Sequence, residues 1–356
     1  MIKTLITAMV ALLFASPLSA AQTPFKVEAI ATLDDPWAMA VLPQGGFLVT
    51  QKAGRLAHVT ASGAVQTIAG APKVTDGGQV GLHDMVLAPD FQTSGLVYLT
   101  WVDGADGGAL HLGRGRLDLA ALQLADLQVL WRATPIGGRG HPGAMIAFGP
   151  EGHLYLTSGD RQLGDPAQEL GDSRGKILRL TADGAPARGN PFADAPEVWT
   201  LGHRNPYGLA FDATGRLWSH EMGPRGGDEL NVIVAGQNYG WPLVSEGMTY
   251  GGRPIPAHAT RPAFAPPLIA WTPVIAPAGM VYYDGALFPE WRGSMLLGGL
   301  ASQALVRVQI GPTTAQEVAR WDMGNRIRDV ATDADGQVYV LEDGSDARLL
   351  RLIPRN

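Results

Sequence analysis

The chain has 356 residues, with 27 lysines and arginines against 33 aspartates and glutamates, a net charge of −6 and no cysteine. This negative balance argues against binding to nucleic acid or to an anionic membrane surface, and the lack of cysteine excludes disulfides as a source of stability. The length exceeds that of a usual single core, so we expect two domains or a repeat architecture.

The first expected element is an N-terminal export signal. One lysine precedes an apolar stretch from Leu5 to Ala15, and Pro17 and small residues follow up to Ala21. This pattern predicts a secretory signal peptide over residues 1–21. The stretch is shorter than the roughly 20 residues that span a bilayer, and no later segment is long and apolar. We therefore expect residues 22–356 to be periplasmic, with no membrane span.

Six copies of one pattern divide the rest of the chain. Each has a turn with glycine, an alternating run, a polar break and a second alternating run. The turn glycines are Gly46, Gly95, Gly152, Gly215, Gly293 and Gly336. Their spacing predicts an all-β fold, a six-bladed β-propeller of four-stranded antiparallel blades, as a single domain over residues 22–356. A β-sandwich or two small β-domains is the alternative.

Helical spacing is scarce along the chain. The best helical candidate, residues 117–130, also alternates as a strand, and we assign it to a blade. Four polar segments, 77–91, 138–152, 201–216 and 325–336, lie just before or within the first strand of a repeat. Because a closed ring brings equivalent positions together, we expect these segments to converge on one axial face.

His141 lies in one of these segments, between glycines and before Pro142. An imidazole presented by such a loop can accept a proton near neutral pH. The alternative is an ordinary surface histidine.

Cationic and amide side chains mark two other segments. His203, Arg204 and Asn205 precede a proline and an apolar strand, and an arginine beside an amide can bind an oxyanion or carboxylate. Arg326 and Arg328 alternate, so both should point to one strand face, where they repel unless an anion lies between them. A strand-end salt bridge and solvated arginines are the respective alternatives.

A glycine-rich turn interrupts the pattern at residues 220–231, HEMGPRGGDELN, where the strand 216–219 is expected to stop. A Gly-Pro pair exposes main-chain carbonyls, and Asp228 and Glu229 add carboxylates, which are the oxygen ligands that Ca2+ prefers. The chain lacks the histidine and cysteine patterns of transition-metal sites. The alternative is a hairpin turn with its acids in solvent.

These motifs, in this order on six β repeats, resemble the soluble pyrroloquinoline quinone (PQQ)-dependent aldose sugar dehydrogenases of the glucose/sorbosone dehydrogenase family. The resemblance runs from about Phe25 to Ile353, and LGHRNPYGLAF followed by EMGPRGGDELN and NYGWP is its most specific part. It implies PQQ and Ca2+ on the axial face, an aldose substrate, and oxidation of the anomeric hydroxyl to a lactone by hydride transfer to PQQ.

The resemblance also implies roles for individual residues. His141 matches the general base and Arg204 the arginine that stabilises charge at the quinone oxygens, with Asn205 beside it. The remaining matches are Gln79, Arg326 and Arg328 as PQQ contacts, the carbonyls of Gly223 and Pro224 as Ca2+ ligands, and Glu229 with the main chain of Tyr239 as a second Ca2+ site.

Two places depart from the family pattern. Ala301 stands where the family often has a lysine for PQQ, and Gly143, Ala144 and Met145 stand where it usually has Gly-Gly-Arg after the base. Losing one cationic partner should weaken PQQ binding by roughly 1 to 3 kcal/mol.

Two other functions stay open from the sequence. One is a Ca2+-dependent propeller lactonase, which needs a metal with several direct side-chain ligands and an activated water. The other is a non-catalytic propeller that binds a sugar or a protein. The electron acceptor and the physiological sugar stay unassigned, and the chain is expected to be a monomer or a homodimer.

Overall fold

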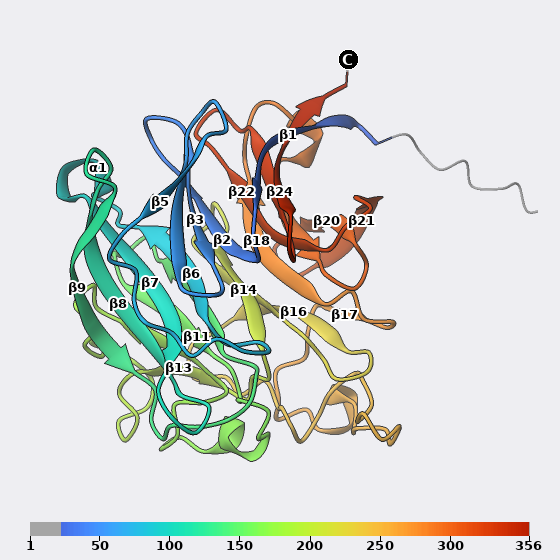
Figure 1. Cartoon of the computed structure of the whole chain (residues 1–356). Helices are drawn as coiled ribbons and strands as arrows, with labels where there is room; N and C mark the ends of the chain where they lie inside the picture. The colour runs from blue at the N-terminus through green and yellow to red at the C-terminus, as the bar shows by residue number, and fades with distance from the viewer. Residues whose placement is uncertain (1–22, 356) are drawn as a thin grey trace, which may run out of the picture.

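The computed structural model describes residues 23–355 as a ring of six four-stranded antiparallel sheets (Figure 1). The predicted six-bladed β-propeller is therefore confirmed, and the sandwich alternative is wrong. The predicted signal peptide, residues 1–21, lies outside the described residues. Within residues 23–355, no helix is long and apolar enough to cross a membrane.

Each blade is one sheet, and in blades 1 to 5 the four strands follow one another in the chain. Blade 1 has β2 (Pro36–Val41), β3 (Phe47–Gln51), β4 (Arg55–Val59) and β5 (Val65–Ile68). Blade 2 has β6 (Leu82–Leu87), β7 (Leu96–Asp103), β8 (Ala109–Asp118) and β9 (Gln123–Arg132). Blade 3 has β10 (Gly143–Phe148), β11 (Leu154–Ser158), β12 (Lys176–Leu180) and β13 (Val198–Leu201).

Blades 4 to 6 complete the ring. Blade 4 has β14 (Pro206–Phe211), β15 (Leu217–Glu221), β16 (Asp228–Ile233) and β17 (Ile269–Trp271). Blade 5 has β18 (Pro277–Tyr283), β19 (Ser294–Gly299), β20 (Ala304–Ile310) and β21 (Ala315–Asp322). Blade 6 has β22 (Ile327–Thr332), β23 (Val338–Glu342), β24 (Ala347–Pro354) and the N-terminal β1 (Phe25–Leu33). Short helices are α1 (Phe91–Ser94), η1 (Asp165–Gln168), η2 (His258–Thr260) and η3 (Pro289–Trp291).

The ring closes by pairing the two ends of the chain. Strand β1 is antiparallel to β24, with Phe25 opposite Pro354 and Leu33 opposite Ala347, and Figure 1 shows the blue strand beside the red one. Blade 6 therefore contains strands from both ends of the chain, which closes the ring.

The repeated glycines make the turn between the first and second strands. Gly46 has φ +82°, and an added Cβ would lie 2.6 Å from the carbonyl oxygen of Val59. Any other residue would be strained there, which explains why the pattern repeats a glycine. Residues 117–130 end β8 and form most of β9, as the strand assignment predicted.

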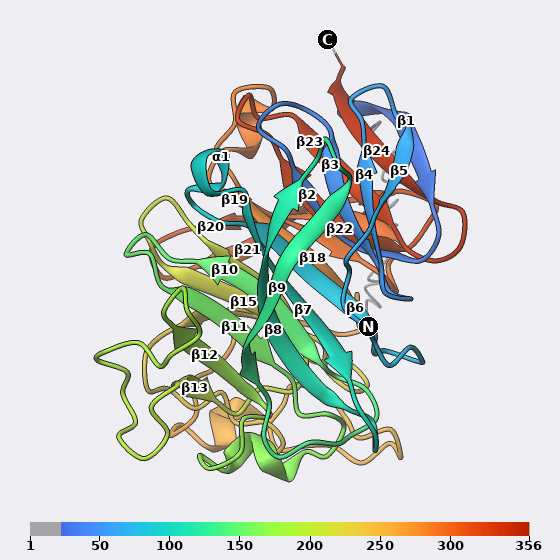
Figure 2. The same cartoon turned by 60° about the vertical axis from the view of Figure 1, so that its left-hand side comes forward.

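Apolar side chains fill the space between neighbouring blades. Leu42, Leu56, Leu82 and Leu99 are buried in one such layer between blades 1 and 2, which face the viewer in Figure 2. Full burial of a leucine side chain contributes about 1.5 to 3 kcal/mol. These layers hold the blades at fixed angles, so the loops at the axis have a rigid base.

Buried hydroxyls also tie successive blades together. The second strands of blades 1, 2 and 3 each donate one threonine hydroxyl to a carbonyl oxygen of the next blade's first strand. The pairs are Thr50 to His83 at 2.6 Å, Thr100 to Ala144 at 2.6 Å and Thr157 to Pro206 at 3.0 Å. The first strands of neighbouring blades contact one another around the axis. The loops that lead into these strands therefore meet at one end of the ring, as predicted.

Candidate active site

His141 is held in its loop from both sides. Its backbone N–H donates to Gln79 Oε1 at 2.8 Å, and its ring Nδ1 lies 2.7 Å from Asp160 Oδ1. The other oxygen of Asp160 accepts a hydrogen bond from Trp241 Nε1 at 2.7 Å. With Nδ1 protonated toward Asp160, Nε2 is the basic nitrogen. Among residues 23–355, no hydrogen bond to Nε2 is present, so it is available to a ligand.

Burial sets the charge state of this imidazole. His141 is 5% exposed, and desolvation lowers its pKa below the ordinary 6.5, with the Arg204 charge acting in the same direction. The hydrogen bond to Asp160 raises the pKa but does not cancel the burial. The ring is therefore neutral at neutral pH, which is the state that a general base needs.

Asp160 contacts the predicted base, and the sequence reasoning did not identify it. It lies two residues after the end of β11, in the loop between the second and third strands of blade 3. Its burial at 2% exposure and its use of both oxygens mark it as an orienting group. A buried acid at the end of a propeller strand, on the same side as the predicted loops, was the available signal.

Arg204 lies between two aromatic rings. Its guanidinium carbon is 5.2 Å from the Trp241 ring centroid and 5.8 Å from that of Tyr250. Its Nη1 donates to the carbonyl oxygens of Met222 at 2.8 Å and Gly223 at 3.1 Å, and its Nη2 to the Tyr250 hydroxyl at 3.0 Å. Nε is buried without a partner among the described residues. This side chain is a fixed cation at the axis, near His141.

The two amides predicted beside these groups lie close to them. Asn205 Oδ1 accepts from the backbone N–H of Gly143 at 3.3 Å, and its Nδ2 faces the sulfur of Met222 at 3.9 Å. Gln79 uses its oxygen on His141 and is exposed. The segments 77–91, 138–152 and 201–216 therefore converge, as the propeller pattern predicted.

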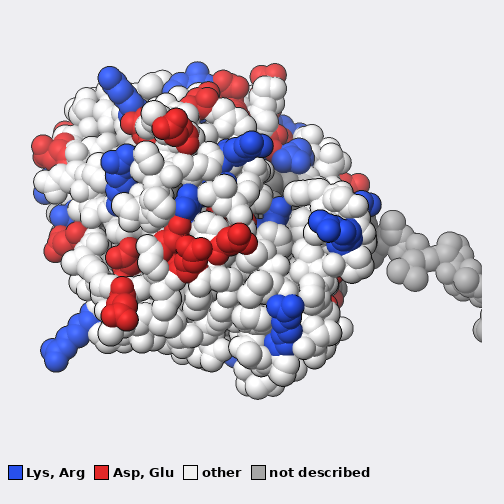
Figure 3. All heavy atoms as spheres, turned by 90° about the horizontal axis from the view of Figure 1, so that it is seen from below, with Lys and Arg blue, Asp and Glu red and all other residues white. Residues whose placement is uncertain are grey.

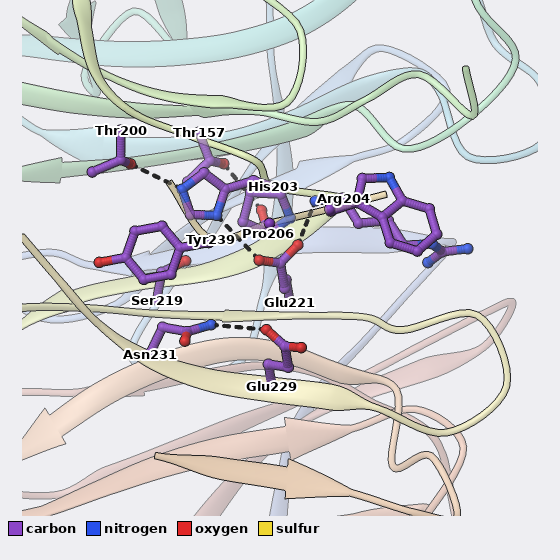
Figure 4. A network of polar contacts seen from close by, with 12 residues as sticks. Thr157, Thr200, His203, Arg204, Pro206, Ser219, Glu221, Glu229, Asn231 and Tyr239 are labelled. Carbon is purple, nitrogen blue, oxygen red and sulfur yellow. Dashed lines mark hydrogen bonds and ion pairs between the residues drawn. The ribbon is translucent and has the colours of Figure 1, made fainter. Parts of the chain in front are cut away.

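His203 has a different position from its neighbour. Figure 4 shows its ring between Thr200 and Glu221, stacked on Tyr239. Nε2 is 2.9 Å from Thr200 Oγ1, and Nδ1 is 3.1 Å from Glu221 Oε1. The other oxygen of Glu221 accepts the backbone N–H of Arg204. His203 and Glu221 thus form the strand-end pair considered as the alternative for this segment, and they hold the Arg204 backbone.

The turn after β15 differs in two details from its prediction. The strand runs to Glu221, two residues beyond the predicted end. Asp228, expected to offer oxygen to a metal, is instead a backbone acceptor: Oδ1 accepts from Gly223 N, and Oδ2 from Ile275 N and Ala276 N at 2.8 and 2.7 Å. The carboxylate therefore fixes the turn and joins blade 4 to blade 5.

Glu229 is buried close to another acid. It is 6% exposed, and burial, with the nearby Glu221 charge, raises its pKa well above its ordinary value. Asn231 Nδ2 donates to it at 3.3 Å, while Asn231 Oδ1 is buried without a partner in the described part of the chain. A small cavity here is lined by Glu221, Glu229 and Tyr239, among others. A carboxylate beside an unsatisfied carbonyl oxygen is a set of atoms that fits a hard cation.

The arginine pair converges on one carboxylate. Arg326 Nε donates to Asp343 Oδ2 at 2.6 Å, and Arg328 Nε donates to Asp343 Oδ1 at 2.8 Å. Arg328 also lies 4.1 Å from the Trp37 ring centroid. The prediction that both side chains share a face with an anion between them is confirmed, and the anion is Asp343 of the chain itself. Figure 3 shows acidic and basic side chains interspersed on the face of the molecule seen from below in Figure 1.

The two departures from the family pattern occupy unlike positions. Ala144 is fully buried with φ +78°, where a residue other than glycine costs about 1 to 2 kcal/mol. Ala301 is exposed in the turn between β19 and β20, and its backbone N–H donates to the carbonyl oxygen of Ile275. A longer side chain at 301 would extend into solvent from the same end of the ring.

The described residues thus form a six-bladed propeller with His141, Asp160 and Arg204 grouped at one end. The glucose/sorbosone dehydrogenase family model matches residues 33–351, so the chain belongs to this family, as the motifs predicted.

Relatives agree along nearly the whole chain. It is 36% identical over 356 residues to the aldose sugar dehydrogenase YliI of Escherichia coli (strain K12), covering 96% of each chain. The crystal structure of the soluble aldose sugar dehydrogenase from Escherichia coli in the apo-form matches with a TM-score of 0.89 at 36% identity, covering 93% of this chain and 100% of that chain. The PQQ-bound form of an aldose sugar dehydrogenase from Streptomyces coelicolor matches with a TM-score of 0.79 at 31% identity, covering 93% and 98%.

Proposed function

We propose that this protein is a PQQ-dependent aldose dehydrogenase that oxidises the anomeric hydroxyl of a pyranose to a lactone, with His141 as general base. The observation that supports it best is the His141–Asp160 pair, because it leaves a neutral, oriented Nε2 at the axial end beside Arg204. Nε2 takes the hydroxyl proton as the hydride leaves C1, and the resulting imidazolium is stabilised by Asp160. Bound PQQ supplies the two-electron acceptor.

The residues at this end fit an anionic quinone. Arg204 has an unpartnered Nε, and Gln79 and Asn205 have amide N–H groups that no strong acceptor takes among residues 23–355. Arg326 and Arg328 share Asp343, which leaves one excess positive charge for a cofactor carboxylate. Arg204 would stabilise negative charge at the quinone oxygens, since its guanidinium is already fixed.

Two Ca2+ sites belong to the proposal. At the first, the carbonyls of Gly223 and Pro224 are the ligands, and Gly223 would share its oxygen with Arg204. Ca2+ there would act as a Lewis acid on the cofactor. At the second, Glu229 and the Tyr239 carbonyl are the ligands, and the unsatisfied Asn231 oxygen supports a cation beside them. Export to the periplasm, proposed from residues 1–21, would place the enzyme where external sugars are available.

Reconstitution tests this function. The mature chain, stripped with a chelator, is given PQQ with and without Ca2+, and reduction of an artificial dye is followed with a panel of aldoses. We expect dye reduction only when PQQ, Ca2+ and an aldose are all present. PQQ and Ca2+ that bind without any dye reduction, for every aldose, would contradict the proposal and favour a lactonase or a non-catalytic binding protein.

A further inference from the structure

Tyr250 is an unusually exposed aromatic residue for one that contacts a buried arginine. The residue is 70% exposed, yet its hydroxyl accepts a hydrogen bond from Arg204 Nη2 at 3.0 Å. Arg204 itself is 4% exposed. The tyrosine therefore reaches into the site with its polar end while its ring stays in solvent. Single exposed aromatic rings are common on protein surfaces, but this ring is fixed beside the predicted base and arginine by its own hydroxyl.

The segment around Tyr250 is tied to the proposed metal turn. The backbone N–H of Met248 donates to the carbonyl oxygen of Arg225 at 3.0 Å, and the N–H of Thr249 donates to the carbonyl oxygen of Arg253 at 2.9 Å. Tyr250 thus sits at the tip of a small hairpin, residues 248–254, that folds back from the long β16–β17 connection onto the loop between β15 and β16. This anchoring fixes the ring at the rim of the site.

Trp241 and Tyr250 flank the same guanidinium but differ in their surroundings. Trp241 is half-buried and bonded through Nε1 to Asp160, so it belongs to the framework that orients His141. Tyr250 makes one hydrogen bond and leaves its ring open. A pyranose presents apolar C–H groups on its ring faces and hydroxyls at its edge. A tyrosine ring with a tethered hydroxyl matches both kinds of surface.

We propose that Tyr250 contacts the sugar in the aldose site: its ring packs against the C–H face of the pyranose, and its hydroxyl keeps Arg204 in place. This inference rests on the proposed function, since it names the sugar contact of that same site. It also predicts that the ring of Tyr250 affects KM and that its hydroxyl affects kcat. Loss of the ring weakens sugar binding, whereas loss of the hydroxyl alone disturbs Arg204.

The test uses the full protein loaded with PQQ and Ca2+ and three variants. Tyr250→Ala should raise KM for hexopyranoses about 3- to 10-fold, and it should also lower kcat because it lacks the hydroxyl that holds Arg204. Tyr250→Phe keeps the ring and should hold KM within about twofold of the parent, with a lower kcat because Arg204 has lost one partner. Met248→Ala, in the same hairpin, is the matched control and should behave like the parent.

Three other outcomes would overturn either the role of Tyr250 or the proposed function. Parental KM in Tyr250→Ala, in an enzyme that oxidises aldoses, overturns the role of Tyr250 and leaves the proposed function standing. Equal changes in Tyr250→Ala and Met248→Ala would mean that only the hairpin had been disturbed, and this also overturns it. A parent that oxidises no aldose overturns the proposed function, and the inference about Tyr250 with it.

Discussion

Two regions at the axial end join a positively charged or basic group to a carboxylate, yet they are built differently. In blade 3, Asp160 is buried and serves one imidazole and one indole. In blade 6, Asp343 is shared by two arginines, one of them 48% exposed. Both oxygens of Asp160 are committed to orientation, whereas Asp343 leaves a net positive charge. The first arrangement suits proton transfer, and the second suits adjustable binding of an anion.

The largest expected effect comes from removing the base. His141→Ala should lower kcat by roughly 10²- to 10⁴-fold, because the proton acceptor is lost, and should leave PQQ binding intact. Turnover is measured by dye reduction and binding by PQQ titration. His58→Ala on β4 is the matched histidine control. Full turnover in His141→Ala would reject the base assignment.

The pH dependence of kcat/KM should report the ionisation of His141. Since the base must be neutral, kcat/KM falls about tenfold per pH unit below the pKa of His141, which burial holds under 6.5. The Asp160 hydrogen bond raises that pKa, so Asp160→Asn should move the acid limb to lower pH. Profiles of the two proteins over pH 4.5 to 8 give the comparison, and an acid limb that moves upward would contradict it.

Asp160→Asn should also slow turnover while sparing the blade 6 region. Loss of a charge-assisted hydrogen bond to the imidazole corresponds to about 10- to 100-fold in kcat. The PQQ concentration needed for half-maximal activity should not change, because no cofactor contact is assigned to Asp160. A rise in that concentration without a fall in kcat would place Asp160 in cofactor binding instead.

In blade 6 the buried arginine should matter more than the exposed one. Arg328 donates two nitrogens to Asp343 and packs on Trp37, so Arg328→Ala should raise the half-saturating PQQ concentration about 10-fold or more. Arg326→Ala should raise it less, because solvent screens that side chain. Fluorescence titration with PQQ measures both, and the reverse order would reject this ranking.

The smallest expected effect is a modest increase in PQQ affinity. Ala301→Lys restores a cation at an exposed position of the same end and should lower the half-saturating PQQ concentration a few-fold. Ala301→Gln is the uncharged control of similar length. A lysine variant that matches the glutamine variant would show that position 301 lies outside the cofactor site.

The fold was predictable because the glycine turns recur and the strands alternate. Gly46 and its five counterparts all have positive φ, which strains other residues, so the repeat is visible directly in the sequence. The convergence of the segments around Gln79, His141 and Arg204 followed from ring closure alone.

The sequence analysis misjudged or missed carboxylates whose hydrogen-bond partners come from distant segments of the chain. Asp228 looked like a metal ligand, but the backbone N–H groups that it accepts come partly from residues 275–276, and no local pattern gives that contact. Asp160 was missed because its partners, His141 and Trp241, come from other loops. Asp343 was not identified either, because it contacts Arg326 and Arg328 from another segment of the chain. The spacing of the arginines indicated an anion between them but not which group supplies it.

The most direct test of the central claim is a single turnover without an electron acceptor. Enzyme loaded with PQQ and Ca2+ is mixed with an aldose deuterated at C1, and the lactone is counted against the bound PQQ. The account predicts one lactone per PQQ and a primary isotope effect on its formation. No lactone, or a rate that does not depend on the isotope at C1 when the chemical step is observed directly, would contradict hydride transfer from the anomeric carbon.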